Sequence, residues 1–349
     1  MGRAMVLIWA CYYVLLGSKC VNCLGVNWGT QASTPLDPKY IVQMLKDNKI
    51  MTAGLGNKIK ATITQNADVY YSGSQGPSAG DFRTEIRDTV VKISRFLDQN
   101  NCPFMVNIYP FLSLYENQDF PIEFALFDGG GKGVHDQNIQ YTNMLDANLD
   151  TLSYCLKKAG VNNVIIIIGE IGWPTNGNKE ANVKMAENFY NGLLKKLAMK
   201  KGTPLHPGYI EVYLFSLTDE NKKSIAPGFF ERHWGIFRYD GQPKFPIDFS
   251  GEGNAKMPVG AKHVKYLSHQ WCVLNDDMKN LSRVKTDLDF ACSLGDCTSL
   301  SYGSTCNKLS ERKNVSYLFN MYFQMSQQSV EACDFNEAAK ITNNNYSTA

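Results

Sequence analysis

The clearest hydrophobic pattern in the chain is a run of five β-branched residues, Val164 to Ile168, which leads into a glycine and then a glutamate. The run is too short to span a bilayer and too β-branched for an ordinary helix, so it predicts a strand buried on both faces of a parallel sheet. Glu170 comes where this strand ends, and Gly169 and Gly172 on either side let a ligand approach closely. A carboxylate in this position is typical of catalytic groups in barrel enzymes, while a glutamate that caps the next turn is the alternative.

Four other segments are predicted as strands, and each ends on polar or aromatic residues. They are Leu24–Gly29, Lys60–Tyr71, Phe104–Tyr109 and Ile210–Phe215. Apolar residues spaced by three and four predict helices between the strands. The expected helices cover Tyr40–Asn48, Phe82–Leu97, Asp146–Ala159, Asn182–Lys200 and, last, a segment near Gly260–Leu267.

Alternation of strands and helices predicts an α/β fold with a parallel sheet. The polar strand ends favour a (β/α)8 barrel of the TIM type, because they would all lie on one face. A barrel of this type requires eight such units, whereas only about five can be counted here. We therefore expect a barrel truncated to about five βα units.

The N-terminus has the layout of a secretory signal peptide, residues 1–23: Arg3, an apolar run from Met5 to Leu16, and short residues up to Cys23. A membrane anchor is the alternative, but the run is short for a bilayer. We expect an exported chain without a membrane span after cleavage. The formal net charge of +2 provides no basic field for nucleic acid, which we exclude as a partner.

Five of the ten cysteines crowd the last quarter of the chain. In an exported protein this density predicts a small disulfide-stapled domain, in which one of the five thiols lacks a partner. A zinc site is the alternative, but paired C-x-x-C spacings are missing, so no metal is expected. The five are Cys272, Cys292, Cys297, Cys306 and Cys333. Cys102 and Cys155 stand alone beside apolar segments and are expected to be buried free thiols.

Several long motifs occur in an order that identifies a family resemblance. They are Gly25–Thr30, Asn66–Tyr71, Val106–Phe111, Gly169–Thr175 and Glu231–Phe237. Together they resemble plant glycoside hydrolase family 17, the endo-1,3-β-glucanases. From Trp271 onward the chain resembles the X8 domain, a family-43 carbohydrate-binding module. The implied organisation is a barrel over residues 24–258, a linker over 259–270 and the module over 271–349.

The resemblance implies catalytic roles. Glu170 matches the nucleophile of a retaining glycosidase, an enzyme type in which a second carboxylic acid about 5–5.5 Å away protonates the leaving oxygen. Glu220, Lys223 and Glu231 match the charged residues that support the nucleophile. Residues that match the sugar-binding cleft are Asn107, Tyr109, Trp173 and Phe215. For the aromatic residues, packing in the core is the alternative.

One departure from the family affects both fold and chemistry. Family members carry three further βα units between the first helix and the strand that matches Lys60–Tyr71, and the last of them ends in a Gly-Asn-Glu-Pro motif that supplies the general acid. This motif does not occur in the sequence, and the block is expected to be deleted near residues 51–54. The general acid is therefore absent, a sheet of five strands cannot close normally, and its edges would expose unpaired backbone. Glu220 and Glu231 are poor substitutes, since the family places them on the nucleophile's side of the sugar.

In the module, the resemblance implies the disulfides Cys272–Cys333 and Cys292–Cys297. Cys306 is left without a partner, because the last cysteine of the family pattern is missing. Asn280, Asn314 and Asn345 each begin an N-x-Ser sequon for glycosylation.

The functional expectation is a secreted cell-wall hydrolase of callose-like β-1,3-glucan, impaired by the lack of the acid. It would act as a monomer and without cofactors, because the chemistry needs only carboxylates and water. One alternative is a non-catalytic β-1,3-glucan-binding protein of the cell wall. Another is a splice product or an incomplete gene model of an active parent.

Overall fold

The computed structural model describes residues 24–27, 31–32, 36–48, 62–117, 119–127, 133–264 and 266–345. Within these residues the main unit is built on a five-stranded sheet in which every neighbouring pair is parallel. In pairing order its strands are β1 (Leu24–Val26), β9 (Glu211–Leu214), β8 (Ile166–Ile171), β5 (Phe104–Asn107) and β2 (Thr64–Asn66). The expected signal peptide lies outside the described residues.

The two edges of this sheet are β1 and β2, which follow one another along the chain with only α1 described between them. Each pairs on one side, so the sheet is open across its described residues. The stretch 49–61, where the deletion was expected, also lies outside the described residues. Among the described residues the sheet thus has five strands, and its two edge strands are those that flank the expected deletion.

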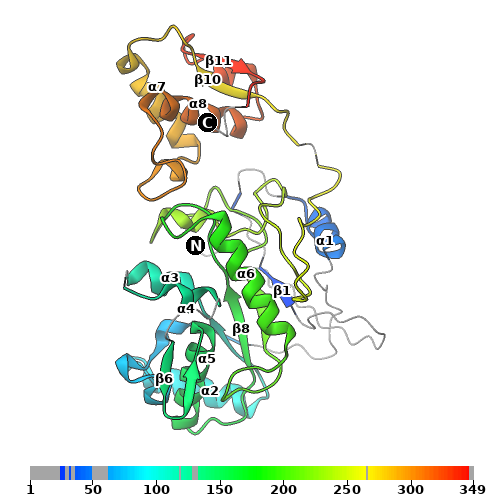
Figure 1. Cartoon of the computed structure of the whole chain (residues 1–349), viewed down its shortest axis with the longest axis vertical. Helices are drawn as coiled ribbons and strands as arrows, with labels where there is room; N and C mark the ends of the chain where they lie inside the picture. Colours follow the sequence, from blue (N-terminus) through cyan, green and yellow to red (C-terminus); the bar gives the residue numbers. More distant parts are fainter. Residues whose placement is uncertain are drawn as a thin grey trace.

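Helices connect and cover the strands (Figure 1). They are α1 (Pro38–Asp47), α2 (Arg87–Gln99), α3 (Pro110–Glu116), α4 (Ile122–Leu126), α5 (Met144–Lys158) and α6 (Val183–Ala198). Asparagine side chains cap the two longest. Asn143 accepts from the amide of Asp146 at 2.9 Å in α5, and Asn182 accepts from Met185 at 3.0 Å in α6. Such caps satisfy donors that the first helical turn leaves free.

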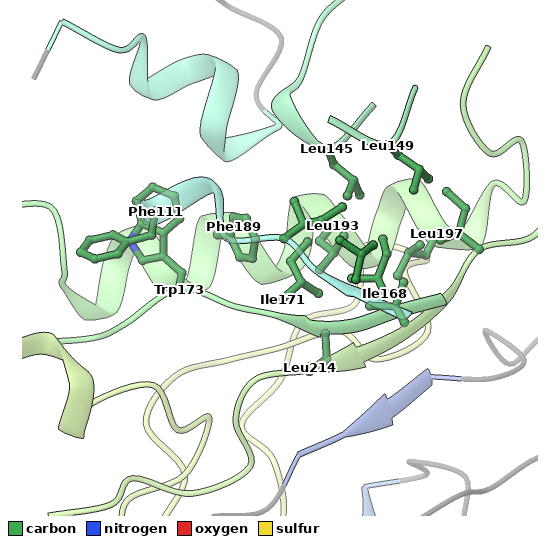
Figure 2. Close-up of a cluster of buried hydrophobic side chains, with 14 of the residues drawn as sticks. Phe111, Leu145, Leu149, Ile168, Ile171, Trp173, Phe189, Leu193, Leu197 and Leu214 are labelled. Carbon is green, nitrogen blue, oxygen red and sulfur yellow. The ribbon is translucent and has the colours of Figure 1, made fainter. Parts of the chain in front are cut away.

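The main core lies between the sheet and these helices (Figure 2). The buried face of α6 repeats every four residues, as the helical period requires. Side chains from β8, α5 and α6 meet there: Ile168, Ile171, Leu145, Leu149, Phe189, Leu193 and Leu197. Each fully buried side chain of this size contributes about 1.5–3 kcal/mol, and this packing fixes the carboxyl end of β8.

Three expected elements differ in the structure. The segment Lys60–Tyr71 is not one strand: β2 ends at Asn66, a 3₁₀ turn follows, and β3 (Tyr70–Tyr71) pairs antiparallel with β4 (Asp81–Phe82). The next helix begins at Arg87 because Phe82 belongs to β4. The described residues of 260–267 form no helix, and the amide of Ala261 instead donates to Gly241 at 3.1 Å. Another short hairpin, β6 (Val134–Asp136) with β7 (Ile139–Tyr141), precedes α5.

The C-terminal unit has its own small core. An antiparallel pair, β10 (Trp271–Leu274) and β11 (Ala339–Thr342), packs with α7 (Lys285–Leu294) and α8 (Glu311–Met325). The disulfides Cys272–Cys333 and Cys292–Cys297 are both present, with Cα atoms 5.6 Å and 5.7 Å apart. They are the pairs that the resemblance implies, and Cys306 is a free, half-buried thiol.

The free cysteines and the sequon asparagines differ in how far they are buried. Cys155 is a buried free thiol, as expected, but Cys102 is only half-buried because it follows the exposed end of α2. Asn280 and Asn345 are exposed, whereas Asn314 is half-buried within α8. Among the described residues, no helix combines the length and the apolar character needed to cross a membrane.

Candidate active site

Glu170 is the second-last residue of β8, and Asn107 on the neighbouring β5 lies opposite it in register. Its carbonyl accepts from the amide of Ile108 at 2.9 Å, so the backbone here is held by the sheet. The side chain is half-buried, and the hydroxyl of Tyr109 donates a hydrogen bond to its Oε2. Gly169 leaves room beside it for the side chain of Met105, because a Cβ there would lie 2.7 Å from Cγ of Met105.

Three further charged residues surround this carboxylate. The ammonium of Lys223 lies 2.8 Å from Oε2 of Glu231, and 4.8 Å from the centre of the Phe215 ring. Glu220 is buried, and its Oε1 accepts from the amide of Gln31 at 2.8 Å. The structure thus brings Glu170, Glu220, Lys223 and Glu231 together, although the last three lie at least 50 residues beyond Glu170 in the sequence.

Opposing influences act on the pKa of Glu170. Burial raises its pKa above the ordinary value, and the nearby carboxylates of Glu231 and Glu220 raise it further. The hydrogen bond from Tyr109 and the charge of Lys223 lower it. Burial and the carboxylate of Glu170 raise the pKa of Tyr109 well above its ordinary value, so the phenol stays neutral and donates. A carboxylate in such a balance can be tuned for catalysis.

An aromatic cluster forms the wall beside Glu170. Tyr109 lies 5.1 Å from Trp234 and 5.8 Å from Phe215, measured between ring centres, and Phe215 lies 5.7 Å from Trp234. Tyr109 and Phe215 are half-buried, so part of each residue remains accessible to solvent. Flat rings of this kind can cover the apolar face of a sugar.

Two buried polar atoms next to this cluster have no hydrogen-bond partner among the described residues. They are Oδ1 of Asn107 and Nε1 of Trp234. An unsatisfied buried polar atom costs about 1–3 kcal/mol, so a structure retains few of them without a reason.

Trp173 does not belong to this wall. Its exposed fraction is 0%, its ring packs on Phe111 and Phe189, and its indole N–H donates to the carbonyl of Glu180 at 2.9 Å. The expectation that Trp173 lines a sugar cleft is therefore wrong. The loop after β8 turns its ring toward the helices, where burial of a large aromatic side chain is favourable.

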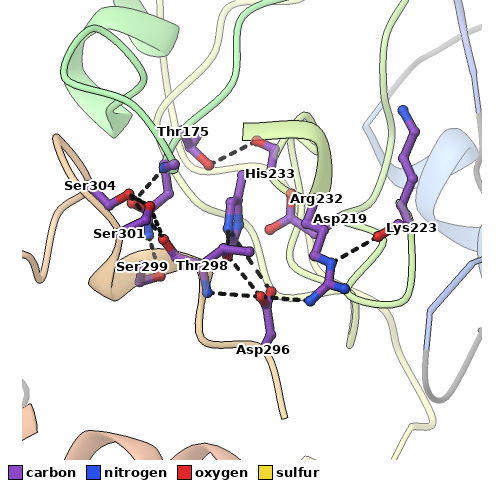
Figure 3. A network of polar contacts seen from close by, with 12 residues as sticks. Thr175, Asp219, Lys223, Arg232, His233, Asp296, Thr298, Ser299, Ser301 and Ser304 are labelled. Atoms are coloured by element: carbon purple, nitrogen blue, oxygen red, sulfur yellow. Dashed lines mark hydrogen bonds and ion pairs between the residues drawn. The ribbon is translucent and has the colours of Figure 1, made fainter. Parts of the chain in front are cut away.

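The sequence analysis missed two features of this region. Trp234 belongs to the motif Glu231–Phe237, but the sequence analysis assigned it no role. The second feature is a polar network that joins the two units (Figure 3). Arg232 pairs with Asp296 at 3.1 Å, and Nε2 of His233 lies 2.6 Å from the hydroxyl of Thr298. These partners are too far apart in the sequence for any local pattern to connect them.

Comparisons with known proteins agree with this architecture. Residues 30–249 match the model of glycosyl hydrolases family 17, and residues 270–340 match the X8 domain. The class defined by the parallel sheet and the carboxylate-bearing strand end is that of TIM-barrel-type glycoside hydrolases. The chain belongs to glycosyl hydrolases family 17 and carries a C-terminal X8 domain.

Among its relatives, glucan endo-1,3-beta-glucosidase 8 of Arabidopsis thaliana is 44% identical over 422 aligned positions, which include 94% of this chain and 88% of that protein. Glucan endo-1,3-beta-glucosidase 5 of the same plant is 49% identical over 288 positions, 82% of this chain and 59% of the relative. The first alignment is longer than this chain of 349 residues, so it contains positions that only the relative fills.

Two solved structures are also similar. A β-1,3-glucanase and allergen of Cryptomeria japonica pollen is 34% identical, with a TM-score of 0.52 over 60% of this chain and 63% of that one. A plant β-glucan endohydrolase is 32% identical, with a TM-score of 0.50 over 53% and 59% of the two chains. Apart from the first relative, the chain thus spans about 59–63% of these proteins.

Proposed function

We propose that this protein acts on β-1,3-glucan and that Glu170 is the nucleophile of a retaining mechanism. The observation that carries the proposal is the setting of Glu170: it ends a buried parallel strand, accepts from Tyr109 and lies in the field of Lys223. An oxygen of Glu170 would attack the anomeric carbon and form a glycosyl-enzyme, which water then hydrolyses. The names of the relatives and of the pollen glucanase support β-1,3-glucan as the substrate.

The first step also requires an acid that gives its proton to the leaving oxygen. Glu231 accepts from the ammonium of Lys223, and Glu220 accepts from a backbone amide. In both contacts the carboxylate is the acceptor, and neither contact shows the donation that a general acid has to make. Without general acid catalysis we expect cleavage of native glucan to be slower by roughly 10²–10⁴-fold than with it.

The absence of the acid follows from the missing block that we propose between α1 and β2. The open sheet, whose edges are β1 and β2, and the long alignment with the Arabidopsis relative both support such a gap. We further propose that the chain is exported to the plant cell wall, on the basis of its N-terminal sequence and its disulfide-bearing C-terminal unit.

The lack of an acid also supports a second candidate, a non-catalytic β-1,3-glucan-binding protein. In this case the X8 unit and the aromatic wall beside Glu170 would hold the polysaccharide, and no bond would be broken.

One experiment separates the two candidates. The purified protein is incubated with 2,4-dinitrophenyl 2-deoxy-2-fluoro-β-laminaribioside, whose dinitrophenolate leaving group departs without protonation. The intact mass of the protein is then measured. A covalent adduct that is absent from Glu170→Gln would support the nucleophile. Reducing-end release from linear β-1,3-glucan is measured in parallel. If the protein binds insoluble glucan but forms no adduct, the hydrolase proposal fails and the binding protein remains.

A further inference from the structure

A cleft of about 530 Å³ opens between the main unit and the C-terminal unit. Residues with large apolar or aromatic side chains line it from both: Tyr115, Ile225 and Phe229 from the main unit, and Tyr302 from the C-terminal unit. Asn178 and Glu180 add polar groups. The volume of the cleft falls within the range of about 300–1,000 Å³ that is usual for the binding sites of small organic ligands.

Tyr302 is 95% exposed although the loop that carries it is firmly anchored. Before it, Asp296 pairs with Arg232, and the hydroxyl of Ser299 accepts from Asn176 at 2.5 Å. After it, the amide of Thr305 donates to Oδ1 of the same Asn176 at 3.1 Å. Asn176 therefore holds both sides of the loop, and the ring of Tyr302 is presented to solvent from a fixed position.

The backbone contact under this loop is close. Gly303 has a φ of +78°, and a Cβ there would lie 2.9 Å from the amide nitrogen of Lys179. A residue with a side chain would push the loop off the main unit. The chain thus has a glycine where the loop of Tyr302 lies against the backbone of Lys179.

One loop connects residues of the candidate active site with residues that line the cleft. Lys223 and Glu231 stand at the ends of this loop and form the ion pair near Glu170. Between them, Ile225, Pro227, Gly228 and Phe229 line the cleft. Tyr115 fixes the middle by donating to the carbonyl of Pro227 at 3.2 Å.

We propose that this cleft is a saccharide subsite shared by the two units, which takes a pyranose unit of the same β-1,3-glucan chain at a distance from Glu170. Phe229 and Tyr302 cover the apolar faces of the sugar, and Asn178 and Glu180 pair with its hydroxyl groups. The inference rests on the proposed function, and it adds that the X8 unit contributes directly to the cleft of the main unit.

The test measures affinity, by calorimetry, for linear β-1,3-gluco-oligosaccharides of increasing length. All proteins carry Glu170→Gln, so that no substrate is consumed. Tyr302→Ala and Phe229→Ala should each weaken the binding of long oligosaccharides by roughly 2- to 12-fold, the range for one aromatic contact, and leave a trisaccharide unaffected. Asn176→Ala should have the same effect because it releases the Tyr302 loop. Tyr71→Ala, which removes an exposed tyrosine outside the cleft, is the matched control.

The outcomes distinguish the inference from the function on which it rests. If the parent protein binds long oligosaccharides and neither aromatic variant weakens this binding, the shared subsite is wrong and the proposed function stands. If only Tyr302→Ala weakens it, the X8 unit binds glucan by itself and the shared subsite is again wrong. If the parent binds no oligosaccharide of any length, the proposed function fails and the inference fails with it.

Discussion

The hydroxyl of Tyr109 donates to Oε2 of Glu170 across the ends of two neighbouring parallel strands. The bond fixes the orientation of the carboxylate and favours its ionised form, which burial disfavours. A nucleophile has to be ionised, so the reactivity of Glu170 should be lost as the pH falls through its raised pKa. Tyr109 is therefore a positioning residue with a measurable effect on a pH profile.

Tyr109→Phe should move the acid limb of this profile to higher pH. The ring contacts with Trp234 and Phe215 remain, and only the hydrogen bond that lowers the pKa of Glu170 is lost. The measurement is the rate of covalent labelling by the activated fluoroglycoside between pH 4 and 8. Tyr266→Phe, which removes a hydroxyl that donates to the backbone of Ala261, serves as the control. An unchanged acid limb in Tyr109→Phe would contradict the positioning role.

Glu170→Gln should stabilise the protein at neutral pH and not at low pH. A carboxyl whose pKa is raised on folding binds more protons in the folded state, so its cost to stability appears as the pH rises through the unfolded and then the folded pKa. The glutamine removes that cost and can still accept from Tyr109. Below the ordinary pKa of a glutamate both forms are neutral, and the difference should disappear.

Thermal unfolding of the two proteins at pH 7 and at pH 4 measures this effect. Glu85→Gln, at an exposed position, should change the melting temperature little at either pH. If Glu170→Gln were destabilising at pH 7, burial would not be the dominant influence on this carboxyl.

The central strand of the site could be predicted because its pattern is local. Five β-branched residues followed by Gly169 and Glu170 specify a buried strand and its end without reference to the rest of the chain. The supporting residues are different: nothing in the sequence around Lys223 or Glu231 marks them as partners, and only the family motifs assigned them. Their ion pair depends on how the loop between them folds back.

Elements that depend on distant packing were not predictable. The 3₁₀ turn after Asn66 exists because β3 pairs with β4, and the alternating sequence hides this break. Trp173 was misassigned because the motif gives its position after β8 but not the side to which its ring turns. The contact of Asn176 with Ser299 joins residues 123 positions apart, and both are ordinary polar residues in loops.

Trp173→Ala should act on stability and leave saccharide affinity intact. The ring is fully buried among Phe111 and Phe189, so its removal leaves a cavity and should cost about 3–5 kcal/mol. Urea unfolding measures the loss, and Trp173→Phe should recover part of it because the smaller ring still fills some of the space. A variant with native stability and weakened oligosaccharide binding would restore the cleft role that the structure rejects.

The two disulfides should differ in what they contribute. Cys272–Cys333 closes a loop with a sequence separation of 61, whereas Cys292–Cys297 spans 5. Loop-closure entropy assigns about 4 kcal/mol to the first and about 2 kcal/mol to the second. The first also joins β10 to the segment before β11 within the small core of the C-terminal unit. A small core has little apolar area to bury, so the unit depends strongly on this bond.

Replacing Cys272 and Cys333 by alanine should therefore unfold the C-terminal unit at a lower temperature than replacing Cys292 and Cys297. Calorimetry with hydrogen exchange across both units would detect this, and the amides of β5 and β8 should keep their protection in either variant. Equal losses from the two replacements would show that strain or residual structure, rather than loop length, determines the contribution of these bonds.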